Sequence, residues 1–554
     1  MLQLKKFRNK KVNQTPRQRL LEIIKQKSVI RSSKGNKITT VKGGNGLWLL
    51  DLRVTFMDSE GLDLIAQLFW QKFADQLPFQ VGGLEAGSVP LVAAIILEGR
   101  RRGMPINGFF VRKERKHTGR QHLIEGQLTP EPIVIVDDLM NSGGTLDKVV
   151  VALADEKRQV RDVFVVTNFG TTRGRDYLAE HGISMTSLFR LRELGLARST
   201  NQRTTRSRVL FQRAWSFQAA DPNYFYIVPK SAPVLDNTSL YFGSDTGIFW
   251  ALDQRTGQPR WQFRAGKDIL GKNIFSSPAL HRGRVYFGSY DGNTYCLNTK
   301  TGKEIWRNTD ADWIGSSPAL APDLGLLFIG REHSIRGRRG SVAAIDLQTG
   351  ETVWDYTVRD YVHGSPAYEP QQQLVACGTN SSEMLLFSAK TGRLRWCYRT
   401  NGAVKYAPVF DTKRNQLIFG CHDGYIYVLD VKTGKEVWKV KTENIIYSTP
   451  LIYKNKAFVS STDKHVYVLD LAKQKVLDVI HINGKLFASP RLIEGQIYIG
   501  STSGIIHTID PQTHASAPCL QVSERITNPI SYNTKNKFFF VPTYANQIIA
   551  CKKK

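Results

Sequence analysis

The sequence predicts two folds in one chain: an α/β domain with a parallel, Rossmann-like sheet, followed by an all-β propeller of eight blades. Two observations carry this prediction. The first part of the chain alternates helical segments with strands that are apolar throughout, and the second part repeats a pattern of short strands roughly every forty residues. A chain of 554 residues is also too long for one ordinary hydrophobic core.

The α/β domain is predicted from segments with two different periods. Apolar residues at helical spacing predict helices over 58–77, 88–103 and 143–157. Continuous apolar runs predict strands over 79–84, 106–114, 132–138 and 160–169. Strands of this kind are typical of a parallel sheet that is covered on both faces.

The repeat begins after residue 230. The segment "SSPALHRGRVYFGSYDGNTYCLNTKTGKEIW" (276–306) returns as "YAPVFDTKRNQLIFGCHDGYIYVLDVKTGKEVW" (406–438) and, weaker, as "ASPRLIEGQIYIGSTSGIIHTIDPQT" (488–513). One proline marks each of eight units: Pro233, Pro278, Pro318, Pro366, Pro408, Pro450, Pro490 and Pro529. The last strand of five units carries a tryptophan: Trp261, Trp306, Trp354, Trp396 and Trp438. Because a blade cannot bury its own faces, these rings are expected to wedge between neighbouring blades.

The eighth unit ends before its tryptophan strand. An upstream segment, "VLFQRAWSFQ" (209–218), places Trp215 where the missing tryptophan belongs. A ring closed by strands from both ends has no free sheet edge. Eight blades are therefore predicted, with seven blades and an irregular last unit as the alternative.

Basic residues concentrate at the start of the chain and before the propeller. The formal net charge is +28, and residues 1–50 hold thirteen Lys and Arg against one acid, Glu22. We assign 1–35 to a basic N-terminal arm, 36–196 to the α/β domain, 197–208 to a basic linker and 209–554 to the propeller. Such runs favour an anionic partner, nucleic acid first, although a solvated tail explains them equally well.

The composition also bears on the compartment. No apolar run reaches membrane-spanning length, and the first residues lack the apolar core of a signal peptide. The six cysteines all lie beyond residue 295 without paired spacing, as expected for reduced, mostly buried thiols. These features predict a cytoplasmic protein without a membrane partner.

The stretch "PIVIVDDLMNSGGTLDKVV" (132–150) is the main candidate site. Backbone N–H groups after a strand end, at the start of a helix, can converge on a phosphate, and Gly143 and Gly144 allow close approach. The carboxylates of Asp137 and Asp138 would repel that phosphate but suit sugar hydroxyls or a hydrated Mg²⁺. A diol site beside a phosphate cradle describes a ribose 5-phosphate; the alternative is a simple helix cap.

The propeller repeats resemble the pyrroloquinoline-quinone (PQQ)-like propeller family, as "GSYDGNTYCLNTKTGKEIW" and "GCHDGYIYVLDVKTGKEVW" illustrate. The resemblance covers roughly 230–550 and implies the fold. Quinone-binding members close their site with a vicinal disulfide, and this sequence has no adjacent cysteines. We therefore expect no PQQ and interpret the propeller as a binding or regulatory platform for a protein partner.

The first domain resembles the type I phosphoribosyltransferases, and "VIVDDLMNSGGT" looks like their motif for phosphoribosyl pyrophosphate (PRPP). "LLDLR" (49–53), "GGLEAGSVPLVAA" (82–94), "FFVRKERKHTGRQHLIEG" (109–126) and "GRDYLAEHGI" (174–183) match the orotate phosphoribosyltransferase branch in order and spacing. The resemblance implies an Mg²⁺-dependent transferase that uses PRPP and a nucleobase-like acceptor, and it implies a homodimer.

Site residues follow from this resemblance by position. Asp137 and Asp138 would hold the ribose hydroxyls and, through water, Mg²⁺. The 5-phosphate would be cradled by Asn141, Ser142, Gly143, Gly144 and Thr145. The pyrophosphate would lie beside Glu85, Ala86 and Gly87. Arg112, Lys113 and Lys116 would lie on a mobile loop that closes over the site, with Lys113 and Lys116 in catalytic roles, and Lys42 would be the lysine on the base side.

Two departures leave the acceptor open. The branch usually has a Leu-Asp-Arg pattern that helps to read the base, and this chain has Asn168-Phe169-Gly170. Its base-side segment reads "VKGGNGLWLLDLR" and lacks the usual Ser-Pro. Two other hypotheses accompany the enzyme: a regulated effector of a bacterial defence system, retron-like or a toxin, in which the propeller senses or docks a partner, and a non-catalytic PRPP sensor.

Overall fold

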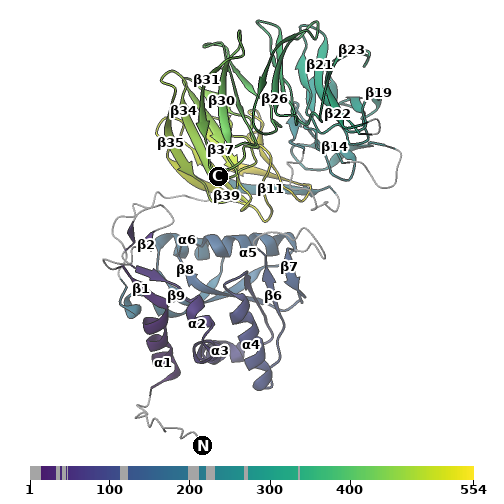
Figure 1. The fold of residues 1–554 in the computed structure, drawn as a ribbon. Helices are drawn as coiled ribbons and strands as arrows, with labels where there is room; N and C mark the ends of the chain where they lie inside the picture. The colour runs from purple at the N-terminus through teal and green to yellow at the C-terminus, as the bar shows by residue number, and fades with distance from the viewer. Residues whose placement is uncertain are drawn as a thin grey trace, which may run out of the picture. The chain divides into compact units, whose positions relative to one another are not determined.

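The structure of the chain is a computed structural model that describes residues 14–32, 38–39, 45–46, 48–112, 123–141, 143–196, 211–219, 231–266, 273–334 and 337–554. It divides into two compact units, Met1–Arg206 and Ser207–Lys554. The basic linker expected over 197–208 lies outside the described residues. Both units are drawn in Figure 1.

The first unit combines helices and strands. Its helices are α1 (Pro16–Ile23), α2 (Arg53–Phe56), α3 (Ser59–Phe73), α4 (Val89–Arg101), α5 (Gly144–Asp155) and α6 (Thr172–Glu180), with the short helical turns η1 (Ile24–Ser28), η2 (Ala74–Gln76) and η3 (Leu191–Leu194). Its strands are β1 (Val29–Arg31), β2 (Ile38–Thr39), β3 (Asn45–Gly46), β4 (Trp48–Leu50), β5 (Gln80–Leu84), β6 (Gly108–Val111), β7 (Ile124–Gly126), β8 (Ile133–Met140), β9 (Val160–Asn168) and β10 (Ser184–Arg190).

The main sheet has six strands in the order β10-β9-β8-β5-β6-β7. All neighbours pair in parallel except β7, which runs antiparallel to β6. The chain passes from β5 outward to β6 and later returns on the other side of β5 as β8. The predicted parallel α/β sheet is confirmed, and the order reverses between β5 and β8.

Helices cover both faces of this sheet, with α5 and α6 on one face and α3 and α4 on the other (Figure 1). Residues along β8 alternate between the two layers. Ile133 and Ile135 pack with the core under α5 and α6, whereas Val134 and Val136 pack with the core under α3 and α4. This two-sided burial explains why the strand is apolar until it reaches its carboxyl end.

Part of the expected basic arm belongs to the folded unit. Helix α1 buries Leu20 and Ile23, and the side chain of Thr15, directly before Pro16, caps its start. Arg17 donates two hydrogen bonds to the carbonyl of Leu188, at 3.1 and 2.7 Å. The apolar residues of this segment recur at helical spacing among the basic ones, so residues 16–31 pack on the unit although their charge resembles a tail.

The second unit is a propeller of eight four-stranded sheets. Blade 1 is β12 (Val234–Leu235), β13 (Ser239–Gly243), β14 (Ile248–Asp253) and β15 (Pro259–Arg264). Blade 2 is β16 (Ala279–His281), β17 (Arg284–Gly288), β18 (Thr294–Asn298) and β19 (Glu304–Asn308). Blade 3 is β20 (Ala319–Ala321), β21 (Leu326–His333), β22 (Arg339–Asp346) and β23 (Thr352–Val358). Blade 4 is β24 (Ala367–Glu369), β25 (Leu374–Gly378), β26 (Glu383–Ser388) and β27 (Leu394–Arg399).

The remaining blades follow in the same order. Blade 5 is β28 (Val409–Asp411), β29 (Gln416–Gly420), β30 (Tyr425–Asp430) and β31 (Glu436–Lys441). Blade 6 is β32 (Leu451–Tyr453), β33 (Lys456–Ser460), β34 (His465–Asp470) and β35 (Lys475–His481). Blade 7 is β36 (Arg491–Ile493), β37 (Gln496–Gly500), β38 (Ile505–Ile509) and β39 (Ser516–Gln521). Blade 8 is β40 (Ser531–Tyr532), β41 (Phe539–Pro542), β42 (Gln547–Lys553) and, from the other end of the unit, β11 (Phe211–Gln218).

The last blade closes the ring with strands from both ends of the unit. Strand β11 pairs antiparallel with β42, from Phe211 opposite Lys553 to Gln218 opposite Gln547. The predicted eight blades are therefore confirmed, and the alternative of seven is excluded.

The predicted tryptophan wedges form a latch between blades. The Trp306 indole donates a hydrogen bond to the carbonyl of Leu347 in the next blade, at 3.2 Å, and its ring lies against Gly350 in the same turn. The same pairing joins four other tryptophans to the following blade: Trp215 with Gln254 and Gly257, Trp261 with Thr299 and Gly302, Trp354 with Ala389 and Gly392, and Trp396 with Val431 and Gly434. Each glycine has a positive φ, between 68° and 80°.

All six cysteines are free, and five of them are buried, the exception being Cys397. Among the helices of the described residues, none is both long enough and apolar enough to cross a membrane.

Candidate active site

Four parallel strands bring the candidate residues to one edge of the main sheet. Strands β5, β6, β8 and β9 run in the same direction, so their carboxyl ends lie along the same edge. Glu85 follows β5, Arg112 follows β6, Asp137 and Asp138 end the apolar part of β8, and Phe169 follows β9. The strand order reverses between β5 and β8, which is where open α/β sheets bind their ligands.

The two aspartates are half-buried at the end of β8. The backbone N–H of Asp138 donates a hydrogen bond to the Asp137 carboxylate, at 2.9 Å. Burial raises the pKa of Asp138, and hydrogen bonds together with the charge of Arg53 oppose that rise. A carboxylate held at this cost can accept hydrogen bonds from hydroxyls or face a cation.

The turn after β8 leads directly into helix α5. Gly143 precedes the helix with φ of +85°, a region that favours glycine, and a Cβ there would lie 3.0 Å from the Tyr177 ring. The Tyr177 hydroxyl in turn donates a hydrogen bond to Asp147 in the first turn of α5, at 3.1 Å. Tyr177 therefore holds the turn and the helix start together. The free N–H groups of a helix start, with the helix dipole, favour an anion at this position.

Asn141 and Thr145, on either side of the Gly143 turn, are both accessible to a ligand. Asn141 is exposed, and its backbone carbonyl accepts a hydrogen bond from the Thr171 hydroxyl. Thr145 is also exposed, in the first turn of α5. Both leave polar groups accessible beside the turn.

The loop after β5 lies beside the residue that follows β6. The Arg112 guanidinium lies 3.6 Å from the Glu85 carboxylate and 3.5 Å from that of Glu125. Gly83 allows a tight approach at the end of β5, because a Cβ there would lie 2.5 Å from the Val136 carbonyl. Ala86 is exposed and Gly87 is partly buried. The structure therefore joins the loop 83–87 to the base of the segment that the sequence predicts to close over the site.

Four of the predicted site residues lie outside the described residues: Lys42, Lys113, Lys116 and Ser142. The described ones, which are Glu85, Ala86, Gly87, Arg112, Asp137, Asp138, Asn141, Gly143, Gly144 and Thr145, all follow or end strands at the edge defined above. Their individual roles stay predictions.

Arg53 is a site residue that the residue-by-residue prediction missed. Its guanidinium forms a bidentate ion pair with the Asp51 carboxylate, at 2.7 and 2.9 Å, and it lies close enough to Asp138 for their charges to interact. Its signal was available, since Arg53 ends the segment "LLDLR". The aromatic pair of Trp48 and Phe169, with ring centroids 6.1 Å apart, has no such signal because the two residues are 121 positions apart.

The carboxylates fit Mg²⁺ only if a substrate completes its coordination. Within the described ranges, no group of three or more His, Cys, Asp or Glu residues could hold a metal ion. Mg²⁺ commonly binds through one or two carboxylates, waters and substrate phosphates. Asp137 and Asp138 supply oxygen ligands of that kind.

Comparison with known proteins assigns the two units separately. The first unit is 35% identical over 182 residues to "Orotate phosphoribosyltransferase" of Bradyrhizobium sp. (strain ORS 278), which spans 32% of this chain and 96% of that protein. The corresponding protein of Aquifex aeolicus (strain VF5) is 31% identical over 180 residues, which is 32% of this chain and 97% of that protein. A family model described as PQQ_2, "Outer membrane protein assembly factor BamB", matches residues 211–356 and 297–518.

A solved structure supports the fold of the propeller. A europium-containing methanol dehydrogenase is similar with a TM-score of 0.51 and 15% identity, over 62% of this chain and 86% of that one. At this identity the likeness concerns the fold alone.

Proposed function

The chain belongs to the orotate phosphoribosyltransferase family in its first unit and to the PQQ_2 family of BamB-type propeller repeats in its second, and from that premise we propose that it transfers phosphoribose from PRPP to a nucleobase-like acceptor with Mg²⁺. The observation that carries the proposal is the edge at which Asp137, Asp138 and the Gly143 turn meet Glu85 and Arg112. The enzyme is a transferase of the phosphoribosyltransferase class.

The ribose and its 5-phosphate would bind at the end of β8. Asp137 and Asp138 would accept hydrogen bonds from the ribose hydroxyls, which replace the solvent that Asp138 loses on burial. Backbone N–H groups of the segment Asn141–Thr145 would hold the phosphate, with Ser142, Gly144 and the Thr145 hydroxyl contributing to the cradle. The Tyr177–Asp147 hydrogen bond would keep this turn in place before the ligand arrives.

The pyrophosphate would lie on the other side of the ribose, beside Glu85, Ala86 and Gly87. Displacement at C1 develops negative charge on the leaving pyrophosphate and positive charge on the ribose. Mg²⁺, held through water by Asp137 and Asp138, would neutralise part of the leaving group's charge. Arg112, Lys113 and Lys116 would supply fixed cations, and closure of their segment would exclude water. Arg112 is already joined to Glu85 at the base of that segment.

The acceptor would bind near the aromatic pair of Trp48 and Phe169. Phe169 lies in the segment where the family has Leu-Asp-Arg, and its backbone N–H donates a hydrogen bond to the carbonyl of Met140, at 2.9 Å. An aromatic edge suits a planar base, and the missing arginine removes one partner for a carboxylate. We therefore propose a planar acceptor that is not restricted to orotate, with Lys42 on its base side.

The experiment is an acceptor screen with the full-length protein. The protein is incubated with PRPP, Mg²⁺ and single acceptors, which include orotate, uracil and other bases, while pyrophosphate release is followed and products are identified by mass. We expect release and a nucleotide product with at least one base other than orotate. Turnover with orotate alone would overturn the acceptor proposal, and PRPP binding without turnover for any acceptor would favour a sensor.

The propeller is proposed as a binding and regulatory platform, and the cytoplasm as the compartment. A homodimer through the first unit is testable by light scattering. Nucleic-acid binding by the basic arm is testable by removal of residues 1–13 alone, which leaves α1 intact. A salt-dependent affinity that this truncation does not change would assign the charge to solubility.

A further inference from the structure

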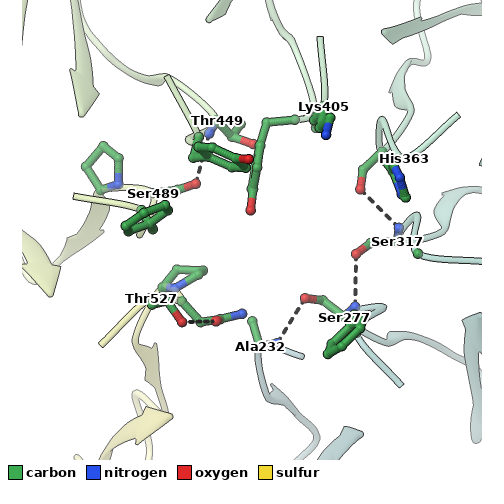
Figure 2. A pocket seen from close by; sticks show the side chains of 18 of the residues that line it. Ala232, Ser277, Ser317, His363, Lys405, Thr449, Ser489 and Thr527 are labelled. Atoms are coloured by element: carbon green, nitrogen blue, oxygen red, sulfur yellow. Dashed lines mark hydrogen bonds between the residues drawn. The ribbon is translucent and has the colours of Figure 1, made fainter. Parts of the chain in front are cut away.

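The propeller encloses a cavity on its axis. Its volume is about 370 Å³, within the range of roughly 300–1,000 Å³ that is usual for small-molecule sites. The lining comes from all eight blades, and each blade contributes the residue directly before its first proline. Figure 2 shows these side chains arranged around the open centre.

A chain of hydrogen bonds links successive blades around this cavity. The N–H of Ala232 donates to the Ser277 hydroxyl at 2.9 Å, the N–H of Ser277 donates to Ser317 at 2.9 Å, and the N–H of Ser317 donates to Ser365 at 3.0 Å (Figure 2). Thr449 and Ser489 repeat the pattern at 2.9 Å. The repeated residue before the proline is therefore structural, and it also lines the cavity with small hydroxyl groups.

Two cations line the cavity wall, and one of them, Arg491, breaks the repeat. Arg491 follows Pro490 at a position where the other seven blades carry Val234, Ala279, Ala319, Ala367, Val409, Leu451 and Ile530. Lys405 lies three residues before Pro408, where blade 1 also has a lysine in the sequence, Lys230. The other blades carry Phe275, Gly315, His363, Tyr447, Phe487 and Ile526 at this position. Since the fold builds seven blades without a cation at the first position, the charge there is not needed for the architecture.

Neither cation is held by an ion pair among the described residues, although the charges of Glu332 and Asp360 act on Lys405. Within the described part of the chain, neither the Lys405 ammonium nor the Arg491 guanidinium makes a hydrogen bond or an ion pair. Burial lowers the pKa of Lys405, which is partly buried, and loss of solvent lowers the pKa of Arg491 although a large part of that side chain stays accessible. Glu332 is itself buried, and its carboxylate lies 2.9 Å from the His363 ring. The cavity therefore presents two cations that are not ion-paired within the described residues, and only Lys405 feels the charge of nearby acids.

Aromatic rings form a continuous part of the same wall. Tyr447 lies edge to face with Tyr406 at 5.7 Å between ring centroids and contacts Phe487 at 5.3 Å. On another side, Phe275 lies edge to face with Tyr290 at 5.0 Å. Rings of this kind provide a surface on which a planar group can stack.

We propose that the axial cavity binds a nucleoside 5′-phosphate. Lys405 and Arg491 bind the phosphate, the aromatic wall receives the base, and the hydroxyl groups face the sugar. The choice of ligand rests on the proposed function, because phosphoribosyl transfer to a base produces a nucleoside 5′-phosphate. The propeller is then a receptor for the product class of the first unit's reaction.

Direct binding to the full-length protein tests this proposal without requiring turnover. Uridine and adenosine 5′-phosphates are titrated calorimetrically against the wild type, Lys405→Met and Arg491→Leu, where leucine is the residue that blade 6 carries at that position. Lys413→Met is the matched control, because Lys413 is an exposed lysine of the same blade outside the cavity lining. We expect each cavity variant to weaken one class of sites at least about 10-fold, Lys413→Met to have no effect, and Arg491→Lys to restore part of the affinity.

Photo-crosslinking assigns that class of sites to a unit. Crosslinking with 8-azidoadenosine 5′-phosphate is followed by peptide mapping, and we expect label on peptides that contain Tyr406 or Tyr447. The label should persist in Asp137→Asn/Asp138→Asn, so a failure of the transferase proposal leaves this result intact. Unchanged affinity in both cavity variants, label confined to the first unit, or tighter binding of PQQ than of any nucleotide would each overturn the proposal.

Discussion

The two units place their functional residues in opposite ways. In the α/β unit the candidate residues occur once each, at the ends of β5, β6 and β8, and they lie together only because parallel strands end at one edge. In the propeller the serine before the proline and the tryptophan latch recur from blade to blade and carry the architecture. The candidates for function are the residues that interrupt the repeat, such as Arg491. A residue that recurs from blade to blade thus indicates a role in the fold. A residue that differs at such a position indicates either a functional role or a local change in packing.

Blade 6 shows that an exception can also be a packing change. Gln474, with φ of 51°, takes the place of the latch glycine, so its Cβ occupies the space in which a tryptophan ring of the preceding blade would lie. The Trp438 indole N–H is buried without a hydrogen-bond partner in the described residues. In the last strand of blade 6 itself, Asp478 takes the place of the tryptophan and lies 3.1 Å from His514 of blade 7. The latch therefore ends after blade 5.

The largest expected effect on activity comes from the aspartates of the α/β unit, which have no repeated counterparts in the chain. Asp137→Asn/Asp138→Asn removes both carboxylates from the ribose site. At about 1.5–3 kcal/mol for each charged hydrogen bond, kcat/KM for PRPP should fall roughly 10²- to 10⁴-fold, measured by pyrophosphate release. Asp75→Asn, an exposed acid of the same unit, is the control and should keep wild-type activity. A double variant with normal turnover would remove the aspartates from the mechanism.

A repeated position should instead affect stability. Gly350→Ala forces a side chain into a backbone with φ of 80° and puts a Cβ 2.6 Å from the Trp306 ring. Left-handed strain of about 1–2 kcal/mol and loss of the latch hydrogen bond, about 1 kcal/mol, should lower the free energy of unfolding by about 2–3 kcal/mol. Denaturation followed by tryptophan fluorescence reports on this unit, because eight of the ten tryptophans lie in it.

Gly495→Ala separates strain from the latch. Gly495 has φ of 78°, but a Cβ there meets nothing within 4 Å. We expect only the cost of strain, about 1–2 kcal/mol. Equal losses in the two variants would show that the ring contact contributes nothing.

The fold was predictable because its signals are local and repeated. Apolar strands ending in Asp137 predicted a parallel sheet, and the prolines with their tryptophans predicted eight blades, including the strand around Trp215. The Arg53–Asp138 and Trp48–Phe169 contacts were not predictable, because they depend on which segments the folded sheet brings together. The basic composition of residues 1–35 likewise concealed the apolar face of α1.

A substitution in the turn at Gly143, which is proposed to hold the 5-phosphate, should lower activity by displacing the backbone. Gly143→Ala combines left-handed strain with a contact 3.0 Å from Tyr177, so the turn must shift. A displacement of this kind should reduce kcat/KM for PRPP about 10- to 100-fold. Gly182→Ala has a similar φ of 63° but open space around its Cβ, and it should leave kcat/KM unchanged. A loss of activity in both variants would attribute the effect to general destabilisation of the unit.

The smallest expected change in unfolding free energy compares Trp396, whose indole makes the hydrogen bond to the next blade, with Trp438, whose indole does not. Trp396→Phe loses the hydrogen bond of 2.7 Å to the Val431 carbonyl and leaves a buried acceptor unpaired, which should cost about 1–2 kcal/mol of unfolding free energy. Trp438→Phe removes a buried donor that already lacks a partner, so it should change stability by less than about 0.5 kcal/mol beyond the loss of ring volume. Both variants are measured by urea denaturation, with circular dichroism as the signal because each lacks one fluorophore. An equal loss of unfolding free energy in the two variants would mean that the indole N–H contributes nothing to either contact. The latch of Trp396 would then depend only on packing of its ring against Gly434.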